Sequence, residues 1–62
     1  MMGKYVYQIM FVNGRFIRFC ADSVQAYDKE YTFFSDGEIA AEFKKDAIAG
    51  YMVLGVNADE DE

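Results

Sequence analysis

The chain contains no histidine and a single cysteine among its 62 residues. Without histidine, a histidine general base, a Cys-His pair and the common zinc sites are excluded. Because Cys20 has no partner within the chain, the disulfide support of many small secreted domains is missing. We therefore expect a cytoplasmic protein that is not an enzyme and that holds no metal and no cofactor.

Long hydrophobic runs are also missing. The longest apolar runs, near residues 9–12 and 51–54, are far shorter than the roughly 20 residues that cross a bilayer. The N-terminal segment lacks the basic, apolar and small-residue order of a signal peptide. We expect no association with a membrane.

Acidic residues outnumber basic ones, but they are unevenly placed. The net charge is -5, from 11 acidic and 6 basic residues, and residues 59–62 supply four of the acids. Seven acids then remain in the body of the chain (11 - 4), which is close to neutral. We predict one small domain over residues 1–56 and an acidic, disordered tail over residues 57–62.

Basic side chains are not gathered beside an exposed aromatic residue. Arg15 and Arg18 lie on opposite faces of an extended strand, which divides the most obvious basic patch. A groove that binds nucleic acid needs such a patch to follow the phosphates and to stack the bases. We do not expect nucleic acid as a partner.

Hydrophobic residues make up 53% of the chain and aromatic residues 18%. A domain of this length buries only about 60% of the surface that its unfolded chain exposes. This apolar content exceeds what so thin an interior can cover, so part of it is expected at an interface. We expect a homo-oligomer, a host protein as a target, or both.

An Asn-Gly pair at residues 13–14 separates two apolar runs and predicts a hairpin with a two-residue loop. Such a loop pairs Phe11 with Phe16 and Met10 with Ile17, and paired residues share a face. Both faces are then apolar, which predicts either a curved, barrel-like sheet or a partner on the second face. One face carries Tyr5, Tyr7, Ile9, Phe11, Phe16 and Cys20, and the other carries Val6, Met10, Val12, Ile17, Phe19 and Ala21.

An Asp-Gly pair at residues 36–37 predicts a second hairpin, in which Ser35 pairs with Glu38 and Phe33 with Ala40. A short strand near residues 24–27 and a last strand over residues 48–56 complete the pattern. The sequence predicts a mainly β fold, a small antiparallel meander or partly open barrel of about five strands.

Residues 37–49 also fit a helix. Ser35 and Glu38 have the spacing of a capping box, the segment that follows is rich in helix formers, and Gly50 stands where a helix would end. The alternative is an α+β fold with this helix, and the sequence leaves both open.

Three segments carry a resemblance to a known group of proteins. A strand with NG, the step ADSV and the run YTFFSDGEIAAEFKKDAIAGY resemble the short β-rich proteins of bacteriophages and prophages. The resemblance implies an accessory protein that binds and inhibits a host protein, with an antiviral defence protein as one such target. The strand order is also similar to that of Sm-like and SH3-like small barrels, which implies architecture alone.

Tyrosine can bury its ring and keep its hydroxyl in water, and arginine is a frequent polar anchor, so both residue types suit an interface. We expect a non-enzymatic protein that occludes a surface of its target. The alternatives are a structural homo-oligomer and a small barrel that binds a small ligand or RNA. Cys20 is expected as a small buried hydrophobe, and Asp22 as a solvated turn residue. The predicted interface residues are Tyr5, Tyr7, Ile9, Phe11, Phe16, Arg18 and Tyr31.

Overall fold

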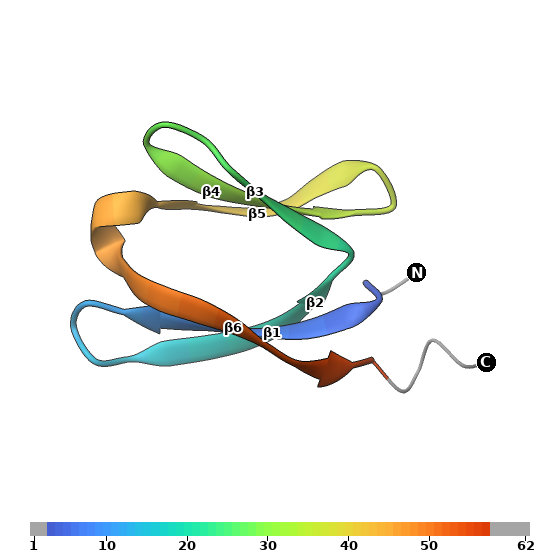
Figure 1. Ribbon diagram of the computed structural model, residues 1–62, viewed down its shortest axis with the longest axis horizontal. Helices are drawn as coiled ribbons and strands as arrows, with labels where there is room; N and C mark the ends of the chain where they lie inside the picture. Colours follow the sequence, from blue (N-terminus) through green and yellow to red (C-terminus); the bar gives the residue numbers. More distant parts are fainter. Residues whose placement is uncertain (1–2, 58–62) are drawn as a thin grey trace.

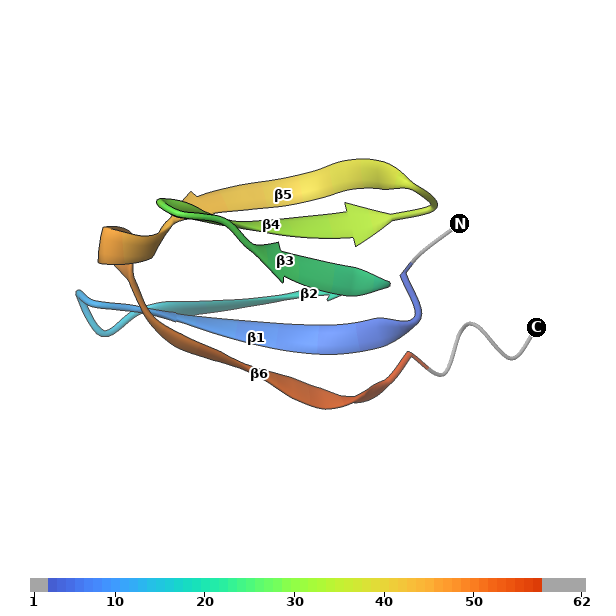
Figure 2. The ribbon, with the colours of Figure 1, turned by 45° about the horizontal axis from the view of Figure 1, so that its top comes forward.

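Two three-stranded antiparallel sheets pack face to face in the computed structural model, which describes residues 3–57 (Figures 1 and 2). The first sheet has the strand order β2-β1-β6 and the second has the order β3-β4-β5. The predicted mainly β fold is confirmed. The strands are β1 (Tyr5–Phe11), β2 (Phe16–Ala21), β3 (Ser23–Ala26), β4 (Glu30–Ser35), β5 (Glu38–Lys44) and β6 (Ile48–Val56), with a 3-10 turn, η1 (Lys45–Ala47), between β5 and β6.

The alternative of a helix over residues 37–49 is wrong. β5 pairs with β4 over its whole length, from Ser35 opposite Glu38 to Glu30 opposite Lys44. The hydrogen bonds of this pairing and the packing of Phe43 against the core outweigh the helix propensity of the segment. The only helical turn of the segment is η1, which spans three residues.

The first hairpin has a three-residue loop, not the two-residue loop that the Asn-Gly pair predicted. The N–H of Phe11 donates to the carbonyl of Arg15 at 2.8 Å, so Val12, Asn13 and Gly14 form the loop. Gly14 has a φ of 91°, whereas Asn13 keeps a negative φ. This is a type I turn followed by a left-handed glycine, and it shifts the register by one residue.

This shift moves every side chain of β2 to the opposite face of the sheet from the one predicted. Phe19 lies opposite Tyr7, and Phe16 lies opposite Met10. The inner face of the hairpin, toward the second sheet, therefore carries Tyr5, Tyr7, Ile9, Phe11, Ile17, Phe19 and Ala21, and its outer face carries Val6, Gln8, Met10, Phe16, Arg18 and Cys20.

The second hairpin has the predicted two-residue loop. Ser35 lies opposite Glu38, and Asp36 and Gly37 take the positive φ values of 55° and 80° that this turn requires. A bulge then moves the pairing by one residue, so that Phe33 lies opposite Ala41 instead of the predicted Ala40. The bulge keeps the side chain of Phe33 in the core.

The core is small and mostly aromatic. Four hydrophobic side chains of residues 3–57 are buried, and Phe33 is completely enclosed. Its ring centroid lies 5.1 Å from that of Tyr7 and 4.9 Å from that of Phe19, both with edge-to-face geometry. Burial raises the pKa of Tyr7, and the neighbouring Tyr51 raises it further. The buried hydrophobic residues are Tyr7, Ile9, Ala21 and Phe33.

Asp22 forms the corner at which the chain leaves the first sheet and enters the second (Figure 1). Its carboxylate accepts hydrogen bonds from the backbone N–H groups of Lys4 and Asp36, both at 2.8 Å, and its own N–H donates to the carbonyl of Phe34 at 2.7 Å. These bonds lower the pKa of Asp22, the one from Asp36 most. Asp22 was predicted as a solvated turn residue, but its hydrogen bonds connect the start of the first sheet to the β4–β5 turn of the second.

The end of the fold lies beside its beginning. The side-chain amide of Asn57 donates to the carbonyl of Gly3 at 3.0 Å, and the N–H of Asn57 donates to the carbonyl of Lys4 at 2.8 Å. A Cβ atom at Gly3 would overlap the backbone of Ala21. Asn57 is buried, although the sequence placed it in the tail, and residues 58–62 of the predicted tail lie outside the described residues.

Replacing Phe33 by alanine should remove most of the stability of the fold. Large-to-small changes at a buried aromatic residue cost about 3–5 kcal/mol, which matches the total stability of many domains of this size. Far-ultraviolet circular dichroism during urea unfolding measures the loss. Ile39→Ala is the control, because Ile39 is 59% exposed; an unchanged midpoint for Phe33→Ala would contradict this description of the core.

Asp22→Asn should reduce the dependence of folding stability on pH in the acid range. Because the pKa of Asp22 is lowered below its ordinary value of 3.8, its contribution is complete above that value. The contribution is lost as the pH falls through the lower pKa of the folded state. Thermal melts of both proteins between pH 7 and pH 2 test this. We expect their melting temperatures to differ most at neutral pH and to converge in acid, whereas a constant difference would contradict the role of the charge.

Candidate protein-binding surface

The outer faces of the two sheets differ in polarity. On the second sheet, polar residues oppose one another across the strands, as Gln25, Thr32 and Glu42 do. The first sheet has an outer face that is mostly apolar, although no other element of residues 3–57 covers it. An antiparallel sheet with one face in water normally alternates apolar and polar residues. The second sheet follows that rule except at the apolar pair of Phe34 and Ile39, and the first sheet does not.

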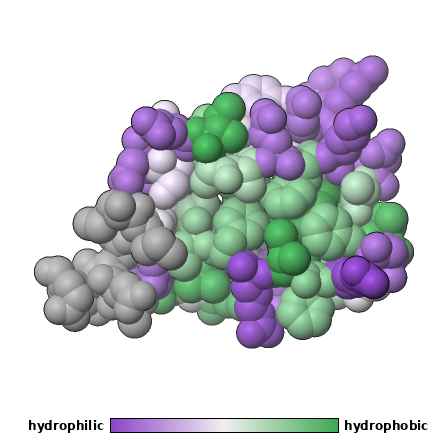
Figure 3. Space-filling model, turned by 180° about the vertical axis from the view of Figure 1, so that it is seen from behind, coloured by the Kyte–Doolittle hydropathy of each residue, from purple (hydrophilic) through white to green (hydrophobic). Residues whose placement is uncertain are grey.

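We define the binding face as the outer face of the first sheet, which β2, β1 and β6 build together. Phe16 is 52% exposed and Met52 is 48% exposed. Contiguous apolar surface on the face of a sheet marks an interaction site. Figure 3 looks along the two sheets from behind the view of Figure 1, so it sees this face edge-on; hydrophobic side chains are also visible there, bounded by hydrophilic ones. The binding face consists of Val6, Gln8, Met10, Phe16, Arg18, Cys20 and Met52.

Arg18 is held in place at the centre of β2. Its Nε–H donates to Oε1 of Gln8 at 2.8 Å, and its guanidinium carbon lies 5.5 Å from the centroid of the Phe16 ring. The bond to Gln8 uses one of the five guanidinium N–H groups. A cation stacked on an aromatic ring and oriented by an amide keeps further N–H groups that can donate to an acceptor on another molecule.

The predicted interface residues separate into two groups. Tyr7 and Ile9 are 4% and 1% exposed, so they belong to the core and are not available to a partner. Tyr5, Phe11 and Tyr31 are half-buried and pack against that core. The sequence placed Phe16 beside Tyr7 because of the wrong register. Phe16 and Arg18 are the two predicted residues that the structure brings together on the binding face.

β6 is a strand, as predicted, but its exposed apolar surface was not predicted. Five large apolar residues lie within six positions of β6, and each is 39% to 63% exposed. The available signal was the absence of any charged residue from the nine residues of this strand. The exposed side chains are those of Tyr51, Met52, Val53, Leu54 and Val56.

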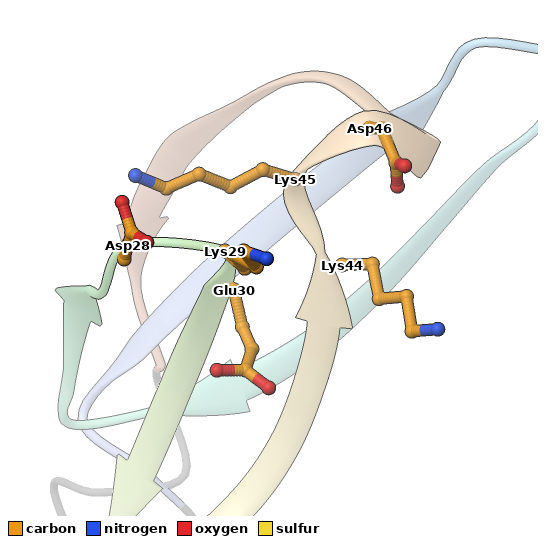
Figure 4. Close-up of a pocket in the computed structure, with 6 residues that line it drawn as sticks. All are labelled: Asp28, Lys29, Glu30, Lys44, Lys45 and Asp46. Carbon is orange, nitrogen blue, oxygen red and sulfur yellow. The ribbon is translucent and has the colours of Figure 1, made fainter.

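A hollow of about 510 Å³ lies between the β3–β4 turn and η1 (Figure 4). Three carboxylates and three lysines line it, so the lining has no net charge. The ammonium group of Lys45 lies 5.4 Å from the centroid of the Tyr31 ring, which engages one of the three cations. This balance of charges favours neither an anion nor a cation as a ligand. The lining residues are Asp28, Lys29, Glu30, Lys44, Lys45 and Asp46.

Three further features of the described residues concern metal binding, the free cysteine and membrane spans. Residues 3–57 contain no group of three or more histidine, cysteine, aspartate or glutamate side chains that could hold a metal ion. Cys20 is a free thiol that is half-buried on the binding face, and was predicted to be buried. No helix within these residues has the length and apolar character needed to span a membrane.

Comparisons with known proteins found no relative of this chain. The chain matches no protein-family model, no curated protein and no solved structure.

Proposed function

We propose that this chain is a non-enzymatic protein-binding module that acts by covering a surface of a larger protein. The observation that carries the proposal is the apolar binding face of the first sheet, with Arg18 oriented on Phe16 along its β2 edge. The polar outer face of the second sheet provides the internal comparison, because it has the composition expected of a face in water. One sheet thus has a surface suited to a protein, and the other has not.

Occlusion needs a rigid surface rather than a reactive group. The binding face lies on paired strands, and the side chain of Arg18 is already ordered by Gln8 and Phe16. An anchor that is ordered before binding loses less conformational entropy when the complex forms. The net charge of -5 accelerates the encounter with a basic target and repels an acidic one.

The resemblance to bacteriophage and prophage proteins suggests a more specific form of the proposal. In that form the module is an accessory protein of a bacteriophage, and its target is a host protein such as an antiviral defence protein. The module would block the target by steric exclusion, without changing it chemically. A purely structural homo-oligomer remains the alternative, and it differs in having no foreign target.

Two substitutions on the binding face test the proposal. Phe16→Ser removes the ring, and Arg18→Glu reverses the charge of the anchor. Full-length chain is immobilised and exposed to lysate of the cells in which it acts, and retained proteins are identified by mass spectrometry. We expect a protein that wild-type chain retains and that each variant binds at least about tenfold more weakly, as for hot-spot residues.

Ile39→Ser is the matched control, since Ile39 is 59% exposed and lies on the outer face of the second sheet. This variant should retain the same protein as the wild type. Equal retention by the wild type, Phe16→Ser and Arg18→Glu would show that the binding face is not used. Retention of no protein at all by the wild type would contradict the proposal as a whole.

A further inference from the structure

β6 is an edge strand that lacks the usual protection of an edge. Edge strands avoid pairing with other chains by being short or by carrying charged residues. β3 has only four residues, β2 carries Arg18, and β5 carries two glutamates and a lysine. β6 has nine residues, none charged and none proline, and it pairs with β1 on one side only.

The side chains of β6 are exposed on both faces of the sheet. Val53 lies opposite Tyr7 on the inner face and is 52% exposed, whereas Met52 lies opposite Gln8 on the outer face and is 48% exposed. A strand in this position offers backbone hydrogen-bonding groups along its free edge and apolar contacts above and below them. Both are needed when another strand adds to a sheet.

Two glycines in β6 stand beside its two register shifts, with open space around them. An added Cβ atom at Gly50 or Gly55 would find nothing within 4 Å, and neither residue has the positive φ that favours glycine. Glycine in a strand marks a bulge or the close approach of another backbone, and the open space here leaves room for such an approach. These residues flank the exposed positions 51–54.

We propose that β6 pairs in antiparallel fashion with β6 of a second copy of this chain. Register shifts near residues 49 and 54 leave residues 50–53 as the regular part of the strand. Directly paired residues share a face, so a two-fold axis perpendicular to the sheet passes between one residue and its own copy. Met52 is central both to the regular part and to the exposed residues 51–54, so we place the axis at Met52, and Val53 lies one residue from it. The product is a continuous six-stranded sheet with the order β2-β1-β6-β6-β1-β2, and the proposal does not depend on the proposed function.

Charge argues for a second copy as the occupant. A two-fold axis places each residue near its own copy, which is unfavourable for charged residues and acceptable for the uncharged β6. The chain has a net charge of -5, and contact through β6 joins two copies along their uncharged strand. The contact also closes on itself, because each copy uses its free β6 edge once.

The dimer would make the module bivalent. An axis perpendicular to the sheet keeps both binding faces on the same side, so that two pairs of Arg18 and Phe16 face the same direction. Binding to a target with two equivalent sites would then gain from the high effective concentration of the second site.

Val53→Lys and Val53→Glu test the dimer on purified full-length chain. Each variant places like charges beside the two-fold axis, while the half-exposed position lets the new side chain reach water in the monomer. By sedimentation velocity over a range of concentrations, we expect the wild type to reach twice the monomer mass and each variant to remain monomeric. An equimolar mixture of the two variants should restore the dimer, because opposite charges then meet at the axis.

Ile39→Lys is the control, because Ile39 has similar exposure on β5, and it should leave the dimer intact. Gly50→Val provides a second test. An added Cβ atom at this position meets nothing within 4 Å in the monomer, so the melting temperature should be retained while dimerisation weakens at least tenfold.

A wild-type chain that stays monomeric at millimolar concentration would overturn the inference, even if it binds a strand of another protein. A dimer that survives in both Val53 variants would overturn it as well. Neither result depends on Phe16 or Arg18, so the proposed function would remain to be judged on its own experiment.

Discussion

The corner at Asp22 is the constraint on which the rest of the structure depends. Without a bend at this residue, β2 and β3 would continue as one strand, and the apolar inner face of the first sheet would have no cover. The carboxylate of Asp22 holds the bend by accepting the N–H groups of Lys4 and Asp36. The second sheet then lies over the first, and Phe33 is placed between Tyr7 and Phe19.

Strands and turns could be predicted from this sequence because their signals are local. β6 has the predicted bounds, and the Asp36-Gly37 loop has the predicted pairing at its ends. The register of the first hairpin could not be predicted in the same way. Asn-Gly fits a two-residue loop and also the three-residue loop with a left-handed glycine, and the choice depends on the φ of a single residue, Asn13.

The candidate site was harder to predict than the fold, because contacts between segments far apart in the sequence determine which of its residues are exposed. Odd and even residues of β1 are similarly hydrophobic, so the pattern alone does not tell which face meets the second sheet. The bend at Asp22 decides this, and it buries Tyr7 and Ile9. Its hydrogen bonds join segments 18 and 14 residues apart, which no local pattern reveals. Phe16 reaches the binding face by the same register that the Asn-Gly pair left open.

The distribution of apolar surface connects the small core to the two proposed contacts. Four hydrophobic side chains within residues 3–57 are buried, yet 53% of the full chain is hydrophobic, so much of this content lies elsewhere. It is concentrated on the binding face and along β6, while the outer face of the second sheet stays mostly polar. Scattered exposure is ordinary for a small domain, whereas a contiguous apolar face and an adjoining apolar edge are typical of interaction sites. A strand can add to the edge without covering the face, and for this reason one chain of 62 residues can accommodate both a second copy and a foreign target.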